Sequence, residues 1–163
     1  MVVTNTSPKV VEFLKRLTKD FPAYKFEPGE QDHWSPRTST ITYNPAQSLK
    51  DLRYSVLHEL AHASLGHQTY HTDFELLKLE SKAWELAAQI GQRYKLKISD
   101  EHIQRCLDTY RDWLHGRSRC PACSMQALQQ SASIYKCQNC GKVWRVSSGR
   151  FVRPYRQAVN KEQ

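Results

Sequence analysis

The chain has 163 residues, of which 39% are apolar and 25% charged, and this composition excludes a wholly disordered protein. No apolar run approaches the roughly 18 residues of a membrane-spanning helix, and the opening MVVTNTSPKVVEF lacks the pattern of a secretory signal, so we expect a cytoplasmic protein with no membrane role. The formal net charge is +8, and it is unevenly distributed along the chain.

Charge and cysteine content divide the chain into three predicted parts. Residues 1–116 hold 15 Lys and Arg and 15 Asp and Glu, whereas residues 117–163 hold nine Lys and Arg and one acid. Four of the five cysteines also lie in the second segment. We therefore predict a globular domain over 1–116, a cysteine-bearing unit over 117–148 and a basic, flexible tail over 149–163.

Capping residues and apolar spacing predict the elements in chain order. Pro8 after Ser7, the pair Ser48 and Asp51, and a similar cap at Thr72 each indicate the start of a helix. Alternating β-branched residues indicate strands, and the stretch 28–36 is turn-like. The expected helices cover 8–20, 49–66, 73–95 and 100–115, and the expected strands 24–27, 38–43, 133–136 and 142–147. The predicted fold class is α+β.

His58, Glu59 and His62 form an H-E-x-x-H pattern inside the helix predicted over 49–66. Residues i and i+4 lie one above the other on a helix, so both imidazoles can reach one Zn²⁺. A catalytic zinc takes three protein ligands and a water whose pKa falls to about 7, and Glu59 is the predicted general base for that water. Because short patterns also arise by chance, a third ligand is needed to favour a metal over structural histidines.

Glu80 is the candidate third ligand. It interrupts the apolar stripe of the helix predicted over 73–95, four residues after Leu76. A lone buried carboxylate costs several kcal/mol or stays protonated, and a metal ion would satisfy it. Ala83 and Ala87 are small enough to let the histidine-bearing helix approach closely. The alternative is that Glu80 lies at the edge of the stripe and reaches solvent.

The motif His58-Glu59-x-x-His62, followed by an E-x-x-A-x-x-L-A pattern that starts at Glu80, resembles the ImmA/IrrE family of metallopeptidases. The resemblance implies a small zincin-like catalytic domain in which His58, His62 and Glu80 hold zinc and Glu59 is the base. It also implies that residues 38–43 form an edge strand near the cleft, where a peptide could add, and that the substrate is a regulatory protein such as a repressor.

The chain also resembles the SprT-like peptidases, which carry an H-E-L-x-H motif and often a zinc-ribbon tail. In that family a later histidine is the third ligand, and the segment His71-Thr72-Asp73-Phe74 offers His71 for this role. This resemblance implies protein attached to DNA as the substrate. His67 and His71 are also candidates for polarising a substrate carbonyl.

The cysteine-bearing unit predicts a second, structural zinc. Cys120-x-x-Cys123 and Cys137-x-x-Cys140 have thirteen residues between them, and two such pairs complete a tetrahedral site. Disulfides or a redox pair are the alternatives, which a cytoplasmic location and the absence of a βαβ pattern disfavour. A unit of this size has too little core to fold without its metal, so we expect a zinc ribbon without catalysis.

Arginines in the C-terminal region alternate with aromatic residues, which suits phosphate contacts and base stacking. The alternative is a solvated basic tail that keeps the protein soluble. The candidate nucleic-acid-binding residues are Arg145, Arg150, Arg153 and Arg156.

Together these motifs predict an intracellular zinc endopeptidase with one catalytic and one structural zinc. It would act on a protein or peptide and dock DNA, a DNA-bound protein or another acidic partner through its basic C-terminal region. One alternative is a SprT-like, DNA-associated protease with His71 as third ligand. The other is a non-catalytic nucleic-acid-binding zinc protein, which would hold one zinc per chain rather than two.

Overall fold

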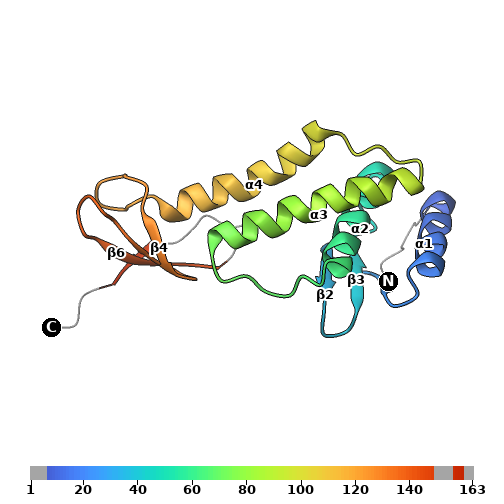
Figure 1. Cartoon of the computed structure of the whole chain (residues 1–163), viewed down its shortest axis with the longest axis horizontal. Coiled ribbons are helices and arrows are strands. Elements are labelled where there is room, and N and C mark those ends of the chain that lie inside the picture. Colours follow the sequence, from blue (N-terminus) through green and yellow to red (C-terminus); the bar gives the residue numbers. More distant parts are fainter. Residues whose placement is uncertain (1–6, 149–155, 160–163) are drawn as a thin grey trace. The chain divides into compact units, whose positions relative to one another are not determined.

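The computed structural model describes residues 7–148 and 156–159, and these residues form an α+β protein, as predicted (Figure 1). None of the helices in this part of the chain is long and apolar enough to cross a membrane. The helices are α1 (Pro8–Asp20), α2 (Leu49–Ser64), α3 (Asp73–Arg93) and α4 (Asp100–Ser118), and the strands are β1 (Lys25–Pro28), β2 (His33–Ser35), β3 (Thr40–Tyr43), β4 (Leu128–Ser131), β5 (Ile134–Lys136), β6 (Val143–Val146) and β7 (Arg156–Ala158).

The chain divides into two compact units. Their boundaries differ from the predicted one, which was a single boundary after residue 116. The first unit contains Met1–Gln68 and Ser81–Asp100, and the second contains Thr69–Glu80 and Glu101–Gln163. α3 is one continuous helix that contributes to both units, and α4 belongs with the cysteine-bearing segment.

The first unit is organised around a sheet of order β1-β3-β2. β3 runs parallel to β1 and antiparallel to β2, so Thr40–Tyr43 is the central strand. The expectation of an edge strand at 38–43 is therefore wrong, and β1 and β2 are the edges. β2 lies in the stretch predicted to be a turn. The sequence did not reveal this strand, because three residues are too few to show an alternating pattern. Its hairpin closes through Ser39, whose φ of 52° lies in the left-handed region.

α2 packs against β3 and β2 and carries the apolar stripe predicted for it. Leu52, Val56 and Leu60 are completely or almost completely buried, and one face of the helix therefore forms the core of the first unit. The Ser48 hydroxyl accepts a hydrogen bond from the Asp51 N–H at 3.1 Å, which caps the helix as expected. Gly66, with a φ of +67°, follows the helix end at Ser64.

The second unit contains an antiparallel sheet of order β4-β5-β6-β7. The strands at 133–136 and 142–147 are present within a residue of their predicted bounds, whereas β4 and β7 were not predicted. The rings of Tyr135 and Trp144 stack with centroids 5.7 Å apart and fill the sheet's small core. This core also contains Cys120 and Cys137, so the cysteine cluster is part of the packing of the sheet.

Arg117 explains why α4 continues past Gly116, where the sequence predicted its end. The Arg117 guanidinium lies 4.2 Å from the centroid of the Trp113 ring and 3.5 Å from an Asp73 carboxylate oxygen. It also donates a hydrogen bond to the Ala132 carbonyl at 2.9 Å. Tyr135 donates a hydrogen bond to the same carboxylate. A glycine inside a helix costs about 1 kcal/mol, and these buried contacts of the next residue offset that cost.

Candidate metal centres

The two histidines of the H-E-x-x-H motif face each other on α2. The Nε2 atoms of His58 and His62 are 3.1 Å apart. Zinc–nitrogen bonds of about 2.05 Å at a tetrahedral angle would place two ligating nitrogens roughly 3.3 Å apart. The ring nitrogens are therefore already spaced as the two ligands of one ion would be.

Glu80 joins this pair from α3. Its side chain is 6% exposed, and one carboxylate oxygen and the two imidazole nitrogens all lie within 4.8 Å of one another. Two imidazoles and a carboxylate form a donor set that suits Zn²⁺ and leaves a coordination position open. His71 is not a member of this group. It is exposed, and its backbone N–H donates to the Glu75 carboxylate at 2.7 Å.

The surroundings of the two histidines include two residues whose contacts the sequence did not predict. The ring of Trp84, one turn after Glu80 on α3, stacks on the His58 ring with centroids 4.1 Å apart. The Nδ1 atom of His67 lies 2.9 Å from the Nδ1 atom of His62. The indole N–H of Trp34 donates to the His67 carbonyl at 3.0 Å, and this holds the segment after α2 in place. The sequence offered His67 as a candidate for polarising a substrate carbonyl, but it gave no sign of a contact with His62.

Glu59 is half-buried and follows His58 on α2. The next residue, Leu60, is completely buried in the core, so the helix turns Glu59 away from the centre of the core. A carboxylate that is neither fully buried nor fully exposed keeps access to water. Its position next to a candidate ligand is the one that the motif assigns to a base.

The four ribbon cysteines form the second centre and contain no disulfide. The Sγ atoms of Cys120 and Cys140 are 3.6 Å apart, and those of Cys123 and Cys137 are 3.5 Å apart. A disulfide bond would need roughly 2.05 Å, whereas two thiolates on one tetrahedral zinc lie roughly 3.8 Å apart. The spacing fits a shared Zn²⁺ and excludes disulfide pairing in this structure.

Two thiols of this cluster, those of Cys123 and Cys140, have very different pKa values. A hydrogen bond from the Met125 backbone N–H and one from the Asn139 side chain lower the pKa of Cys123 to about 6. The Lys142 backbone N–H acts to lower the pKa of Cys140, but desolvation and hydrogen bonding with the other three thiols outweigh it and raise that pKa to about 12. Four adjacent thiols cannot all ionise alone, and a divalent cation removes this conflict.

The four candidate nucleic-acid-binding arginines lie in different surroundings. Arg145 is exposed on β6. Arg156, on β7, donates from Nη1 to the Arg119 carbonyl at 2.7 Å and so contributes to the structure of its own unit. Arg150 and Arg153 lie outside the described residues. Of the two that the structure describes, Arg145 is the more exposed.

Comparison of the chain with protein-family models, with curated proteins and with solved structures gives no match.

Proposed function

We propose that this chain is a zinc-dependent endopeptidase whose catalytic centre consists of His58, Glu59, His62 and Glu80. The observation that carries this proposal is the convergence of two imidazoles and one buried carboxylate within 4.8 Å. A Zn²⁺ held by these three side chains would supply Lewis-acid activation of water and of the scissile carbonyl. The resemblance to ImmA/IrrE peptidases agrees with this ligand set, and the resemblance to SprT-like peptidases, which would use His71, agrees less well.

In the proposed reaction Glu59 moves the proton. Its carboxylate takes a proton from the attacking water as the new carbon–oxygen bond forms, and later gives it to the amine nitrogen as the carbon–nitrogen bond breaks. The other residues hold the centre in position. Trp84 fixes the plane of the His58 ring by stacking. With zinc on Nε2 of His62, the Nδ1 atom of His62 would carry the proton and donate it to Nδ1 of His67, which lies 2.9 Å away.

The cysteine cluster has a structural role in this proposal. Four thiolates fill a tetrahedral site and leave no position for a substrate, so a second Zn²⁺ there would hold the sheet together. Exposed Arg145 on β6 supports a docking role for this unit towards nucleic acid or an acidic protein. Weakening of such binding by added salt is the test of that role.

The zinc content of the purified protein and its cleavage of a degenerate fluorogenic peptide library test the proposal together. We expect two zinc ions per chain and cleavage by the wild-type protein. Glu59→Gln should retain both ions and lose cleavage by at least a hundredfold, the low end of what general-base catalysis contributes. Glu85→Gln, which removes an exposed carboxylate from α3, is the matched control and should cleave normally.

Two results would contradict the proposal. A wild-type protein that holds two zinc ions and leaves every peptide of the library intact would remove the assigned activity. A protein with a single zinc, bound by the cysteines, whose nucleic-acid affinity survives His58→Ala would favour a non-catalytic nucleic-acid-binding protein.

A further inference from the structure

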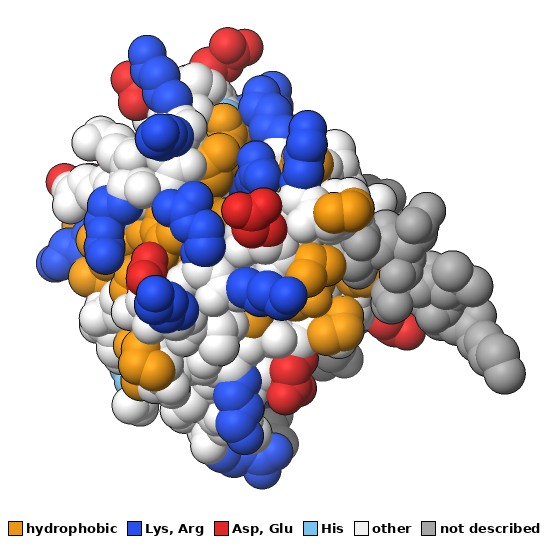
Figure 2. Space-filling view, turned by 90° about the vertical axis from the view of Figure 1, so that its right-hand side faces the viewer, with side chains coloured by type: hydrophobic (Ala, Val, Ile, Leu, Met, Phe, Trp, Pro, Cys, Tyr) orange, Lys and Arg blue, Asp and Glu red, His pale blue; other side chains and the backbone are white. Residues whose placement is uncertain are grey.

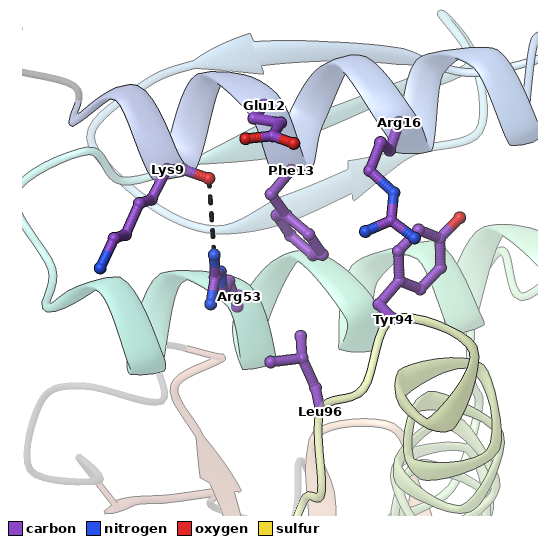
Figure 3. Close-up of a pocket in the computed structure, with 7 residues that line it drawn as sticks. All are labelled: Lys9, Glu12, Phe13, Arg16, Arg53, Tyr94 and Leu96. Atoms are coloured by element: carbon purple, nitrogen blue, oxygen red, sulfur yellow. Dashed lines mark hydrogen bonds between the residues drawn. The ribbon is translucent and has the colours of Figure 1, made fainter.

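The first unit contains a recess, distinct from the metal-ligand group, between α1, α2 and the segment that follows α3 (Figure 3). Its volume is about 160 Å³. Lys9, Glu12, Phe13 and Arg16 come from α1, Arg53 comes from α2, and Tyr94 follows α3. The recess is smaller than the roughly 300–1,000 Å³ of sites for drug-sized ligands, and it therefore suits a small group.

The lining carries an excess of positive charge. Lys9, Arg16 and Arg53 are cationic, and Glu12 is the acidic residue of the lining, so the net charge is two positive. Among the described residues, no carboxylate forms an ion pair with any of these three cations. Cations gathered in a recess without carboxylate partners repel one another, and an anion bound there would relieve that repulsion.

Arg53 leaves hydrogen-bonding capacity unused at this recess. Its Nη2 atom reaches the Lys9 carbonyl only at 3.5 Å (Figure 3). Its Nε–H is buried and has no hydrogen-bond acceptor among the described residues. A buried donor without an acceptor costs about 1–3 kcal/mol, and more when it belongs to a charged group. A bound oxyanion would supply the missing acceptor.

Aromatic rings hold the two guanidinium groups in position. Arg53 lies 5.5 Å from the centroid of the Phe13 ring, and Arg16 lies 5.1 Å from that of Tyr94. The Phe13 ring lies between the two arginine side chains in Figure 3. The Tyr94 hydroxyl donates to Asp20 at 2.6 Å, so it is already committed to a partner. The recess therefore combines pre-positioned guanidinium groups with an apolar floor.

We propose that this recess binds a phosphate group, with Arg16 and Arg53 as its guanidinium ligands and Lys9 as an additional cation. A net charge of two positive matches a dianionic phosphate better than a single carboxylate, and arginine binds phosphate oxygens in a bidentate manner. The face on which α1 lies also carries more Lys and Arg than Asp and Glu, which attracts anions to it (Figure 2).

Calorimetric titration of the full-length, zinc-loaded protein with inorganic phosphate and with phenyl phosphate, at low ionic strength, tests this site. We expect Arg16→Gln and Arg53→Gln each to weaken binding about tenfold or more. Arg53→Lys keeps the charge but loses the planar fork, and we expect a smaller loss. Arg37→Gln removes an exposed arginine from the turn before β3 and should leave the affinity unchanged.

The variant His58→Ala separates this site from the candidate catalytic zinc, which could itself bind phosphate. Binding that survives His58→Ala and falls in both arginine variants supports the recess, whether phenyl phosphate binds more tightly than inorganic phosphate or equally well. The proposal is overturned by a lack of binding at millimolar concentrations, by an affinity that both arginine variants preserve, or by binding that His58→Ala abolishes. Circular dichroism of each variant confirms that it is folded.

Discussion

The two candidate metal centres differ in what holds their ligands in place. The histidines and Glu80 lie on long helices, and α2 has a core of its own in Leu52, Val56 and Leu60. The cysteines lie beside short strands, and Cys120 and Cys137 are two of the five fully buried residues of the core they belong to. One centre is therefore added to a fold that packs without it, whereas the other is part of the packing itself.

This difference predicts opposite couplings between metal and folding. Removal of zinc from the cysteine cluster would leave four thiols side by side, two of them in a very small core that depends on them for its packing. Removal of zinc from the other centre would leave the helix α2 with its own buried stripe of Leu52, Val56 and Leu60 intact. The first loss should unfold a sheet, and the second should abolish the proposed activity without unfolding.

The largest expected effect is that of Cys137→Ser. Zinc binding to sites of this kind contributes about 10–16 kcal/mol to folding, so the variant should lose one zinc ion and the protection of β4 to β7 against hydrogen exchange. The control is Cys106→Ser, because Cys106 lies on α4 outside the cluster. A fully protected sheet in the Cys137→Ser protein would contradict the view that the cluster is structural.

Glu80→Gln tests the histidine centre, which we expect to be independent of folding. Loss of this ligand should lower zinc affinity at the histidine centre by more than the roughly 10–100-fold that loss of an outer-shell partner costs, while the cysteine zinc stays bound. In metal-free protein the same change should alter the free energy of unfolding by less than about 1.5 kcal/mol, because glutamine has nearly the volume of glutamate and fills the same buried space. Competition with a chelator and urea unfolding measure the two quantities, and Glu85→Gln is the control.

A metal-free Glu80→Gln protein that is several kcal/mol less stable than metal-free wild type would show that Glu80 is a structural residue. In that case the histidine centre, like the cysteine cluster, would be part of the packing of its own unit.

His67→Ala has a smaller expected effect, because His67 contacts the candidate ligand His62 and is not itself in the candidate ligand group. Loss of the Nδ1 contact with His62 should reduce zinc affinity about 10–100-fold without a change in zinc stoichiometry at saturation. His67→Gln retains a hydrogen-bond acceptor and should recover part of the affinity. Equal affinities for wild type and His67→Ala would show that this contact does not orient His62.

The sequence predicted which side chains gather at the two candidate metal centres better than it predicted the architecture around them. Zinc-ligand patterns are set by local geometry, namely one turn of α2 for His58 and His62 and a tight turn for each C-x-x-C pair. Glu80 was found because a charge on an apolar stripe is a local anomaly. The contacts of Trp84 and His67 with the two histidines could not be predicted in this way, because a tryptophan on the apolar face of a helix and a histidine in a loop are ordinary residues. The sequence had proposed His67 for a different role, that of polarising a substrate carbonyl.

The strand order and the unit boundary depend on contacts between distant residues, and this explains the errors there. Nothing in TSTITY indicates that β3 is central, since that follows from the pairing of a three-residue β2. Gly116 suggested a helix end, but Arg117 contacts Asp73 and Ala132, which are 44 and 15 residues away in sequence, and these contacts carry α4 into the second unit.

The smallest effect concerns two tyrosine–aspartate hydrogen bonds, Tyr94 to Asp20 in the first unit and Tyr135 to Asp73 in the second. Burial and the hydrogen bond to Asp20 raise the pKa of Tyr94 to about 12, and burial and Asp73 also raise the pKa of Tyr135. A raised tyrosine pKa stabilises the folded state in full below about pH 10, which is the pKa in the unfolded chain, and this stabilisation is lost as pH rises through 12.

Tyr94→Phe should lower the free energy of unfolding by about 1 kcal/mol at pH 8, and it should remove the loss of stability between pH 10 and 12 for the first unit alone. Hydrogen exchange resolved by segment measures both units at once. If Tyr94→Phe changed the alkaline behaviour of the second unit equally, the two units would unfold together, and the separate couplings of their metals would have to be abandoned.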